Sequence, residues 1–348
     1  MKRALVLGGY GVFGSLIARE LVEHQIAVTI AGRDGAKAKR LAVSLKGDAH
    51  AVALDARDKD ACLAVFREHE VVAHAAGPFS AGETSVLEAC LEAGAHYVDI
   101  ADDRAYVAEV LSFGARFRDA GLAAVTGCSS LPGISGALAT KLKNENPEPP
   151  ERLRVTLFIG NRNPKGEGAV RSAFRVLGKP IKAPQGTIPG FGDPETVLLP
   201  GPWAERRVYN FEGPEYDLFP SEFGAASVSV KLGFESKAAT RLFACLARVP
   251  QTLRTALFPV LLKLGNAMSG RGASGGAVVV EFFAKDGTAR RAEAFAPERG
   301  QRMAILPAVA SVRKLLSGDL ETCGAMTVYR FIPGCRWEGW GVSDPPRG

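Results

Sequence analysis

The chain has 348 residues, of which 47% are hydrophobic and 23% are charged, values typical of a folded globular protein with room for two cores. Its formal net charge of +6 is scattered, and no motif of basic and aromatic residues accompanies it, which argues against nucleic-acid binding. The six cysteines lie far apart without a CxxC pair or a histidine cluster, so we expect reduced thiols and no metal site. With no secretory signal and no apolar stretch of about 20 residues, the sequence favours a cytoplasmic protein.

Residues 1–128 alternate between short apolar runs and helical patterns. Runs rich in Val, Ala and Ile predict strands over 4–8, 27–32, 51–55, 71–77, 96–101 and 123–128. Apolar residues at helical spacing predict helices between them, over 12–24, 36–45, 59–69, 83–94 and 104–121. This alternation is typical of an α/β fold with a doubly wound parallel Rossmann sheet.

The chain changes character after the Pro-rich residues 146–151, which we interpret as a connector. Strands are expected over 152–160 and 227–235, and a hairpin that turns at Asp286-Gly287 is expected over 277–295. The Gly- and Pro-rich residues 160–202 are expected to form loops around one helix, 169–178, and another helix is expected over 303–318. The sequence therefore predicts three parts: an NAD(P)-binding Rossmann domain (1–140), an α+β substrate and dimerisation domain (151–320), and a C-terminal segment (321–348) that packs back on the first domain.

Gly9, Gly11 and Gly14 form a G-x-G-x-x-G motif directly after the first strand and at the start of the first helix. Gly9 permits a tight turn, Gly11 lets the backbone approach a pyrophosphate, and Gly14 lets the helix pack closely on the strand. The amides at the start of the helix then face the phosphates. We expect the cofactor to contact the whole turn, which consists of Gly9, Tyr10, Gly11, Val12, Phe13 and Gly14.

The end of the second strand indicates which dinucleotide is bound. NAD-binding domains usually carry Asp or Glu there, and this carboxylate accepts hydrogen bonds from the ribose hydroxyls. This chain instead has Gly32, which leaves room for a 2′-phosphate, and Arg33, whose guanidinium binds it, so we predict NADP (NADPH) as cofactor. The alternative is that Arg33 is a solvated loop residue while Asp34 caps the next helix.

Further residues that follow strands belong to the same site, because ligands bind at the carboxyl ends of parallel strands. Asp55 is expected near the adenine, and Phe79 either bounds the nicotinamide pocket or belongs to a stiff turn. Cys128 has no readable base beside it, so a role as nucleophile is disfavoured. The expected contacts near the nicotinamide are Ala76, Gly77, Pro78 and Ser129.

These motifs together resemble the saccharopine dehydrogenase-like family of NADP-binding reductases. The resemblance rests on GGYGVFGS, AGR, LDARD, AAGPF, YVDIADD and GCSSLPGIS and covers mainly residues 1–140. It implies hydride transfer between NADPH and an imine or secondary amine, that is, at a CH-NH centre, while other members look like enoyl reductases. All five histidines lie before residue 97, which excludes a histidine acid from the second domain.

Polar residues at the end of the fifth strand are the candidates for acid and base chemistry. Tyr97, Asp99 and Asp102 are the candidate catalytic residues, with Asp99 first among the carboxylates. Neighbouring carboxylates raise one another's pKa, so that one of them acts as an acid or pairs with a cationic iminium. The alternative is that Asp102 or Asp103 caps the helix that begins at Arg104.

The sequence thus predicts a cytoplasmic NADP-dependent oxidoreductase that acts on a small molecule as a homodimer, by hydride transfer at a CH-NH centre. Two alternatives stay open: an enoyl-type reductase with a hydrophobic or lipid-like substrate, and a non-catalytic NADP(H)-binding regulatory protein. Residues 240–264 are basic and apolar and contain no acid, so they either pack in a core or dimer interface or contact a membrane or lipid.

Overall fold

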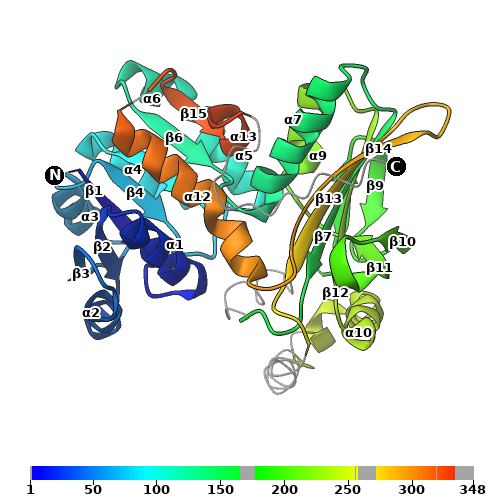
Figure 1. Ribbon diagram of the computed structural model, residues 1–348, viewed down its shortest axis with the longest axis horizontal. Helices are drawn as coiled ribbons and strands as arrows, with labels where there is room; N and C mark the ends of the chain where they lie inside the picture. The colour runs from blue at the N-terminus through cyan, green and yellow to red at the C-terminus, as the bar shows by residue number, and fades with distance from the viewer. Residues whose placement is uncertain (1, 165–176, 255, 258–271, 319, 334–348) are drawn as a thin grey trace. The chain divides into compact units, whose positions relative to one another are not determined.

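The computed structural model describes residues 2–164, 177–254, 256–257, 272–318 and 320–333, which belong to two compact units (Figure 1). The first unit consists of the residues up to Gly133 together with Ala304–Pro333, and the second contains Ile134–Met303. The chain therefore leaves the first unit once and returns to it near its C-terminal end. The helix expected over 169–178 lies mostly outside the described residues.

The first unit is built on a seven-stranded parallel sheet with the order β15-β6-β5-β4-β1-β2-β3. From β3 to β6 this is the Rossmann order, which confirms the fold class expected from the sequence. The direction in which the chain adds strands reverses between β1 and β4, and ligands bind at the carboxyl ends of the strands at such a point. The strands are β1 (Arg3–Leu7), β2 (Ala27–Gly32), β3 (Ala49–Ala53), β4 (Val71–His74), β5 (His96–Asp99), β6 (Ala123–Thr126) and β15 (Gly324–Thr327).

Helices alternate with these strands as the apolar spacing predicts. They are α1 (Val12–Glu23), α2 (Gly35–Ser44), α3 (Lys59–Phe66), α4 (Ser85–Ala93), α5 (Arg104–Ser112), α6 (Gly114–Asp119), α12 (Gly300–Ser317) and α13 (Val328–Phe331). The prediction of a single helix over 104–121 is wrong in one respect, because the chain forms two helices there, α5 and α6, which are divided at Phe113.

The break between α5 and α6 lies beside β15, a short strand that the sequence did not indicate. β15 pairs with β6 from Gly324↔Ala123 to Thr327↔Thr126. A Cβ on Gly114 would lie 3.9 Å from the backbone of Ala325, so the start of α6 lies close against this added strand. Four residues without a marked apolar alternation gave no signal for it.

The second unit contains a six-stranded mixed sheet with the order β10-β11-β12-β7-β13-β14, in which only β12 and β7 run parallel. Its described elements are β7 (Arg152–Ile159), β10 (Glu195–Leu198), β11 (Glu205–Asn210), β12 (Ser227–Phe234), β13 (Gly276–Phe283), β14 (Ala289–Ala296), the separate hairpin β8 (Pro180–Ala183) and β9 (Gly186–Pro189), and helices α7 (Ser135–Glu145), α9 (Glu215–Phe223) and α10 (Lys237–Ala247). The hairpin at Asp286-Gly287 is confirmed, with Gly287 at a φ of +86°. The loop expected over 160–202 is wrong in part, because three short strands lie within it.

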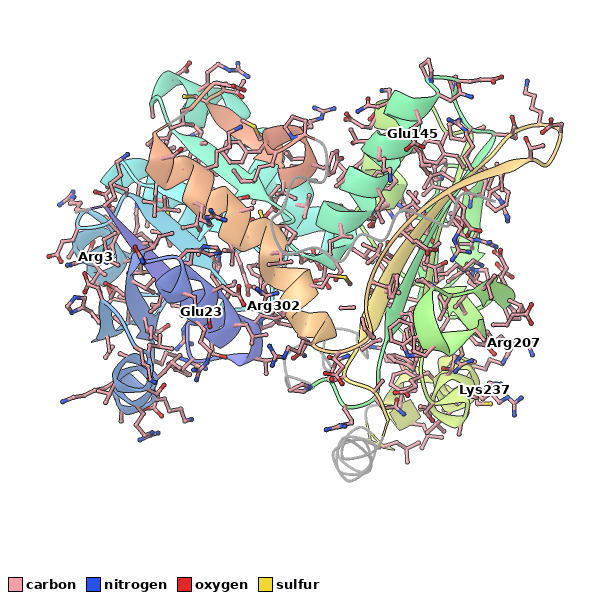
Figure 2. All side chains as sticks on the ribbon, in the orientation of Figure 1. Arg3, Glu23, Glu145, Arg207, Lys237 and Arg302 are labelled. Carbon is pink, nitrogen blue, oxygen red and sulfur yellow. The ribbon has the colours of Figure 1, made fainter. Side chains whose placement is uncertain are left out.

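The two faces of this sheet differ. One face carries a continuous apolar set that packs against α7 and α9, including Val155, Val230, Val280 and Phe282. The opposite face carries Arg154 and Lys231 and, beside them, an apolar cluster around Trp203. Exposed charges such as Arg207 and Lys237 lie on the outside of the unit (Figure 2).

Candidate active site

The turn after β1 is folded as the glycine motif requires. The amides of Gly8 and Gly9 donate to the Ala31 carbonyl on β2 at 2.8 and 3.1 Å, so the turn is tied to the neighbouring strand. A Cβ at Gly14 would lie 2.2 Å from the Gly8 oxygen, and any side chain there would therefore push α1 away from the turn. No side chain caps α1, which begins at Val12, so its first amides are open to a phosphate. The cradle fits the pyrophosphate of a dinucleotide.

Gly8 is a part of the site that the sequence motif did not include. It has a φ of +77°, which favours glycine, and a Cβ there would lie 2.7 Å from the Cα and the amide nitrogen of Ala76. The phosphate turn and the segment after β4 therefore touch at Ala76, one of the expected nicotinamide contacts. The signal was the additional glycine before the motif, which both its positive φ and the close approach of Ala76 explain.

The end of β2 differs from the expectation in one physical detail. A Cβ on Gly32 would lie 2.4 Å from Cε1 of Tyr10, so the space beside Gly32 holds the Tyr10 ring and not an open place for phosphate. The Tyr10 hydroxyl accepts a hydrogen bond from the Asp34 amide at 3.0 Å. Asp34 caps α2 through the Lys37 amide at 2.9 Å, as expected, while Arg33 is exposed between the two fixed residues.

Asp55 follows β3 and is held by a neighbour that the sequence analysis did not consider. Arg57 donates to it from Nε at 3.1 Å and from a terminal guanidinium nitrogen at 2.7 Å, and the Arg57 amide also donates to it at 3.1 Å. These hydrogen bonds from Arg57 lower the pKa of the Asp55 carboxyl to about 2. Asp55 is therefore ionised at neutral pH, and its contact with adenine stays a prediction.

The segment after β4 lies at the sheet edge where a nicotinamide is expected. Its start is tied to β1, because the Ala75 amide donates to the Leu7 carbonyl at 2.8 Å. Gly77 and Pro78 are exposed, whereas the Phe79 ring packs inward against His74, with centroids 4.9 Å apart. Phe79 thus belongs to the packing of the first unit, and Gly77 and Pro78 are free to contact a ligand.

Beneath this segment lies a buried cluster of titratable side chains from β4, β5 and α5. The Tyr97 hydroxyl is 3.1 Å from His74 Nδ1 and 2.7 Å from the Tyr106 hydroxyl. Burial lowers the pKa of His74 to about 4 and raises the pKa of Tyr97 well above its ordinary value, so both side chains are neutral at pH 7. Sequence analysis found Tyr97 but missed His74 and Tyr106, which the parallel pairing of β4 with β5 and the start of α5 bring together.

Asp99 lies at the end of β5 beside this cluster, and its side chain has no exposed surface. Its Oδ1 accepts hydrogen bonds from the Ala101 amide at 2.9 Å, the Thr126 hydroxyl at 3.0 Å and the Gly127 amide at 2.9 Å. Burial raises the pKa of Asp99 to about 6, although these hydrogen bonds oppose the shift. Asp99 therefore joins the ends of β5 and β6, and its assignment as the first catalytic candidate among the carboxylates stays a prediction.

Asp102 and Asp103 have different surroundings in the turn after β5. Asp103 caps α5, since its Oδ1 accepts the Tyr106 amide at 3.0 Å. Asp102 is not the cap; its side chain reaches the surface, yet desolvation by its surroundings and the charge of Asp103 raise its pKa to about 6. The alternative in which a carboxylate of this turn serves as a cap is thus confirmed for Asp103, and Asp102 is left as the exposed carboxylate.

The segment after β6 is also tied to β5, because the backbone carbonyl of Asp99 accepts a hydrogen bond from the Cys128 amide at 2.9 Å. Ser129, which is partly exposed, donates from its hydroxyl to the Leu131 carbonyl at 2.8 Å, so it shapes the turn that leads to α7. Burial raises the pKa of the Cys128 thiol well above its ordinary value, so the thiol is protonated at neutral pH and is a poor nucleophile.

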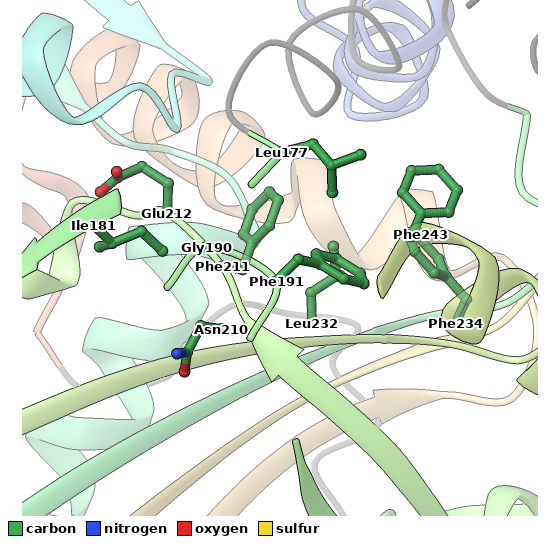
Figure 3. A pocket seen from close by; sticks show the side chains of 10 residues that line it. All are labelled: Leu177, Ile181, Gly190, Phe191, Asn210, Phe211, Glu212, Leu232, Phe234 and Phe243. Atoms are coloured by element: carbon green, nitrogen blue, oxygen red, sulfur yellow. The ribbon is translucent and has the colours of Figure 1, made fainter. Parts of the chain in front are cut away.

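The second unit has a small hollow beside α10 that is mostly apolar (Figure 3). Asn210 and Glu212 are its polar lining residues, and Asn210 already donates to the Pro189 carbonyl and to Asp193. The free space holds little more than about one water molecule, so the hollow is too small for a substrate. The lining residues are Leu177, Ile181, Gly190, Phe191, Asn210, Phe211, Glu212, Leu232, Phe234 and Phe243.

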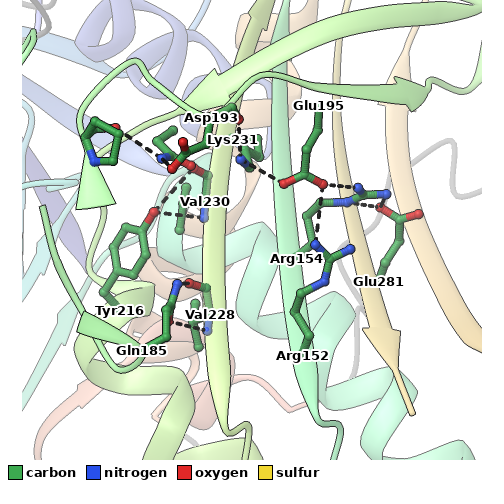
Figure 4. A network of polar contacts seen from close by, with 12 residues as sticks. Arg152, Arg154, Gln185, Asp193, Glu195, Tyr216, Val228, Val230, Lys231 and Glu281 are labelled. Atoms are coloured by element: carbon green, nitrogen blue, oxygen red, sulfur yellow. Dashed lines mark hydrogen bonds and ion pairs between the residues drawn. The ribbon is translucent and has the colours of Figure 1, made fainter. Parts of the chain in front are cut away.

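Charged groups of the second unit are paired on the polar face of its sheet (Figure 4). Lys231, of which 2% of the side chain is exposed, lies 2.8 Å from Glu195, and Arg154 lies 2.7 Å from Glu281. Burial opposes ionisation of Glu195, yet Lys231 and Arg154 hold its pKa below the ordinary value. These groups neutralise one another and resemble a structural network more than a reaction centre.

The described part of residues 240–264 exposes two large apolar side chains, Leu242 and Leu253. Residues 255 and 258–264 of this stretch lie outside the described residues. Within the described ranges, no helix combines the length and the apolar composition that crossing a membrane demands. Contact of this stretch with a lipid or a second subunit stays a prediction.

Comparison with known proteins supports the fold of the chain. No curated protein matches the chain. Apo saccharopine dehydrogenase (L-Glu forming) from Saccharomyces cerevisiae is similar in fold, with a TM-score of 0.68 at 14% identity and 94% of each chain covered. Serine dehydrogenase from Escherichia coli matches 36% of this chain and 80% of its own at 17% identity, with a TM-score of 0.30.

The family comparison identifies the cofactor that the glycine turn holds. Residues 4–125, from β1 into β6, match the family described as the saccharopine dehydrogenase NADP binding domain. This range contains the glycine turn, Arg33, the segment after β4 and the buried cluster around Tyr97. Residues 4–125 of the first unit are thus similar to the NADP-binding domain of saccharopine dehydrogenase, and this likeness supports NADP as the cofactor.

Proposed function

We propose that this chain is an NADP-dependent oxidoreductase that transfers hydride at a CH-NH centre, reducing an imine to a secondary amine. The observation that carries the proposal is the buried cluster of imidazole, phenol and carboxyl groups at the carboxyl ends of β4 and β5. NADPH supplies the hydride when bound, and the balanced reaction is imine + NADPH + H⁺ → amine + NADP⁺. The proton and the orientation of the substrate are then the task of the chain's own residues.

Asp102 is the candidate for contact with the substrate nitrogen, because it is the exposed carboxylate of the turn after β5. A carboxylate beside an imine favours its protonated, iminium form, which accepts hydride more readily at carbon. Tyr97 and Asp99 have no exposed surface and act as positioning residues. Asp99 fixes the ends of β5 and β6, and Tyr97 joins β5 to His74 and Tyr106.

The proposal is tested by NADPH oxidation with a panel of primary amines and carbonyl compounds, supplied singly and in pairs. We expect turnover only when both an amine and a carbonyl compound are present. Asp102→Asn should lower kcat/KM by about 100-fold or more and leave the Kd for NADPH unchanged. Asp103→Asn is the matched control, because it removes the neighbouring charge while the amide oxygen can still accept the Tyr106 amide and cap α5, so it should change activity little.

The outcomes separate this reaction from the alternatives. Oxidation of NADPH by an α,β-unsaturated acyl compound alone would overturn the CH-NH assignment in favour of an enoyl-type reductase. Tight NADPH binding without turnover on either panel would favour a binding protein. Full activity of Asp102→Asn would remove Asp102 from the substrate site.

Cytoplasmic location and a homodimer also belong to this proposal. A homodimer predicts a mass of about twice the 36.8 kDa of the chain in light scattering. A mass equal to that of one chain at the concentration of the activity assay would contradict it.

A further inference from the structure

Tyr10 is placed where two parts of the cofactor site meet. It lies inside the glycine turn, and its ring packs over Gly32 at the end of β2. A Cβ on Gly32 would lie 2.4 Å from Cε1, 2.9 Å from Cζ and 3.0 Å from the hydroxyl oxygen of this ring. The ring can take this place only because residue 32 has no side chain.

The Tyr10 hydroxyl also fixes the backbone next to Arg33. It accepts the Asp34 amide at 3.0 Å, and the Gly32 carbonyl accepts the Leu54 amide at 3.0 Å. Arg33 therefore lies between two anchored residues, and the second of them, Asp34, caps α2. Removing the phenol would free one of the two anchors.

The Arg33 side chain is available to an anion. It is exposed, and within the described residues it makes no hydrogen bond or ion pair. Asp55 is a nearby acid whose charge acts on Arg33, but its carboxylate is already bound by Arg57. The guanidinium is therefore not consumed by an internal partner, and its position depends on its backbone.

From these contacts we propose that Tyr10 determines cofactor selectivity as a positioning residue. Its ring fills the space beside Gly32 that a side chain at position 32 would occupy. Its hydroxyl fixes the backbone of the Arg33 loop so that the Arg33 side chain can bind a 2′-phosphate. Tyr10 thereby couples the turn that binds the pyrophosphate to the loop that binds the 2′-phosphate. The proposal depends on the NADP-binding domain and not on which substrate is reduced.

The test compares two probes that share the adenosine half of the cofactor, adenosine 2′,5′-bisphosphate and 5′-AMP, by calorimetry at pH 7.5. Tyr10→Phe keeps the ring and removes only the hydrogen bond to Asp34. We expect its Kd for the bisphosphate to rise by about three- to tenfold, the range for one hydrogen bond, and its Kd for 5′-AMP to stay within about twofold. Tyr209→Phe, in the second unit, is the matched control and should change neither.

A second pair of variants keeps the proposal falsifiable if Tyr10→Phe is silent. Gly32→Ala should displace the ring and weaken bisphosphate binding, but it should have little effect in a Tyr10→Ala background, where no ring is displaced. Equal losses for both probes in Tyr10→Phe, or equal effects of Gly32→Ala in both backgrounds, would overturn the proposal. A 2′-phosphate preference unchanged in all variants would also overturn it.

Discussion

The buried ionisable groups of the two units have different partners. In the first unit, His74, Tyr97 and Asp99 are buried with shifted pKa values and contact one another and backbone amides. In the second unit, Lys231 and Arg154 each lie against a carboxylate. Burial of titratable groups without a partner of opposite charge shifts their pKa values and is concentrated at functional sites, whereas buried ion pairs are a common structural device. The difference supports our proposal that the chemistry takes place at the edge of the first sheet.

The largest effect is expected from closing the glycine turn. In Gly14→Ala, the new Cβ would lie 2.2 Å from the Gly8 oxygen, so α1 must move away from the phosphate. We expect NADPH affinity to fall by about 100-fold, equivalent to about 2.7 kcal/mol, in a calorimetric titration. Gly114→Ala, where the nearest atoms are 3.9 Å away, is the control. Retained affinity in Gly14→Ala would place the cofactor elsewhere.

The paired charges of the second unit predict a loss of stability without a loss of cofactor binding. In Glu195→Ala, Lys231 and Arg154 each lose a carboxylate, and Glu195 is only 25% exposed. We expect the free energy of unfolding to fall by about 2 kcal/mol in urea, with NADPH affinity unchanged. Asp48→Asn, which breaks an exposed contact with His50, should cost less than about 0.5 kcal/mol. Weaker NADPH binding in Glu195→Ala would show that this network is part of the site.

The burial of Asp99 predicts that the stability of the first unit rises as the pH falls, whereas a carboxylate in a salt bridge would make it fall. The pKa of Asp99 is about 6 in the folded chain and about 3.9 when unfolded, so the folded state binds more protons between these values. Relative to Asp99→Asn, the wild type should therefore gain about 1 kcal/mol of stability as the pH falls from 7 to 5. The comparison with the variant removes the opposing contribution of His74, whose pKa is lowered. Parallel stability curves for the two proteins would contradict the burial of an ionisable Asp99.

The smallest effect concerns Asp55, whose pKa of about 2 is set mainly by the hydrogen bonds from Arg57. In Arg57→Ala the pKa of Asp55 should rise towards its ordinary value, and carboxyl carbon NMR against pH measures it. The stability that Asp55 contributes in the wild type, which is lost as the pH falls from about 4 to about 2, should then shrink, because the folded and unfolded pKa values of Asp55 approach one another. An unchanged pKa would assign the shift to Arg33 or the backbone.

The sequence predicts the first unit well because its signals are local. The glycines at 9, 11 and 14 and the strands that follow them are fixed by short-range geometry, and the cap at Asp34 follows from its position. The contacts that the sequence did not indicate are long-range: Tyr10 over Gly32, His74 on Tyr97, and β15 on β6. In each case a residue type alone says nothing about which strand end or helix it faces.

The second unit was less predictable for the same reason. Its strands β8 to β11 are four to six residues long and are separated by segments with Gly and Pro, so no apolar alternation extends far enough to identify them. The pairing of Arg154 with Glu281 joins residues 127 positions apart. The sequence positions of Arg154 and Lys231 therefore do not reveal that these charges are neutralised within the sheet.

The central claim is that the edge of the first sheet binds NADP and distinguishes it from NAD by the 2′-phosphate. One measurement tests this claim most directly. The purified chain is heated with NADPH and with NADH at equal concentrations, since a ligand of the native state raises the melting temperature. The structure predicts a clear rise with NADPH and a much smaller one with NADH. Equal shifts, or a larger shift with NADH, would contradict the account of Tyr10, Gly32 and Arg33.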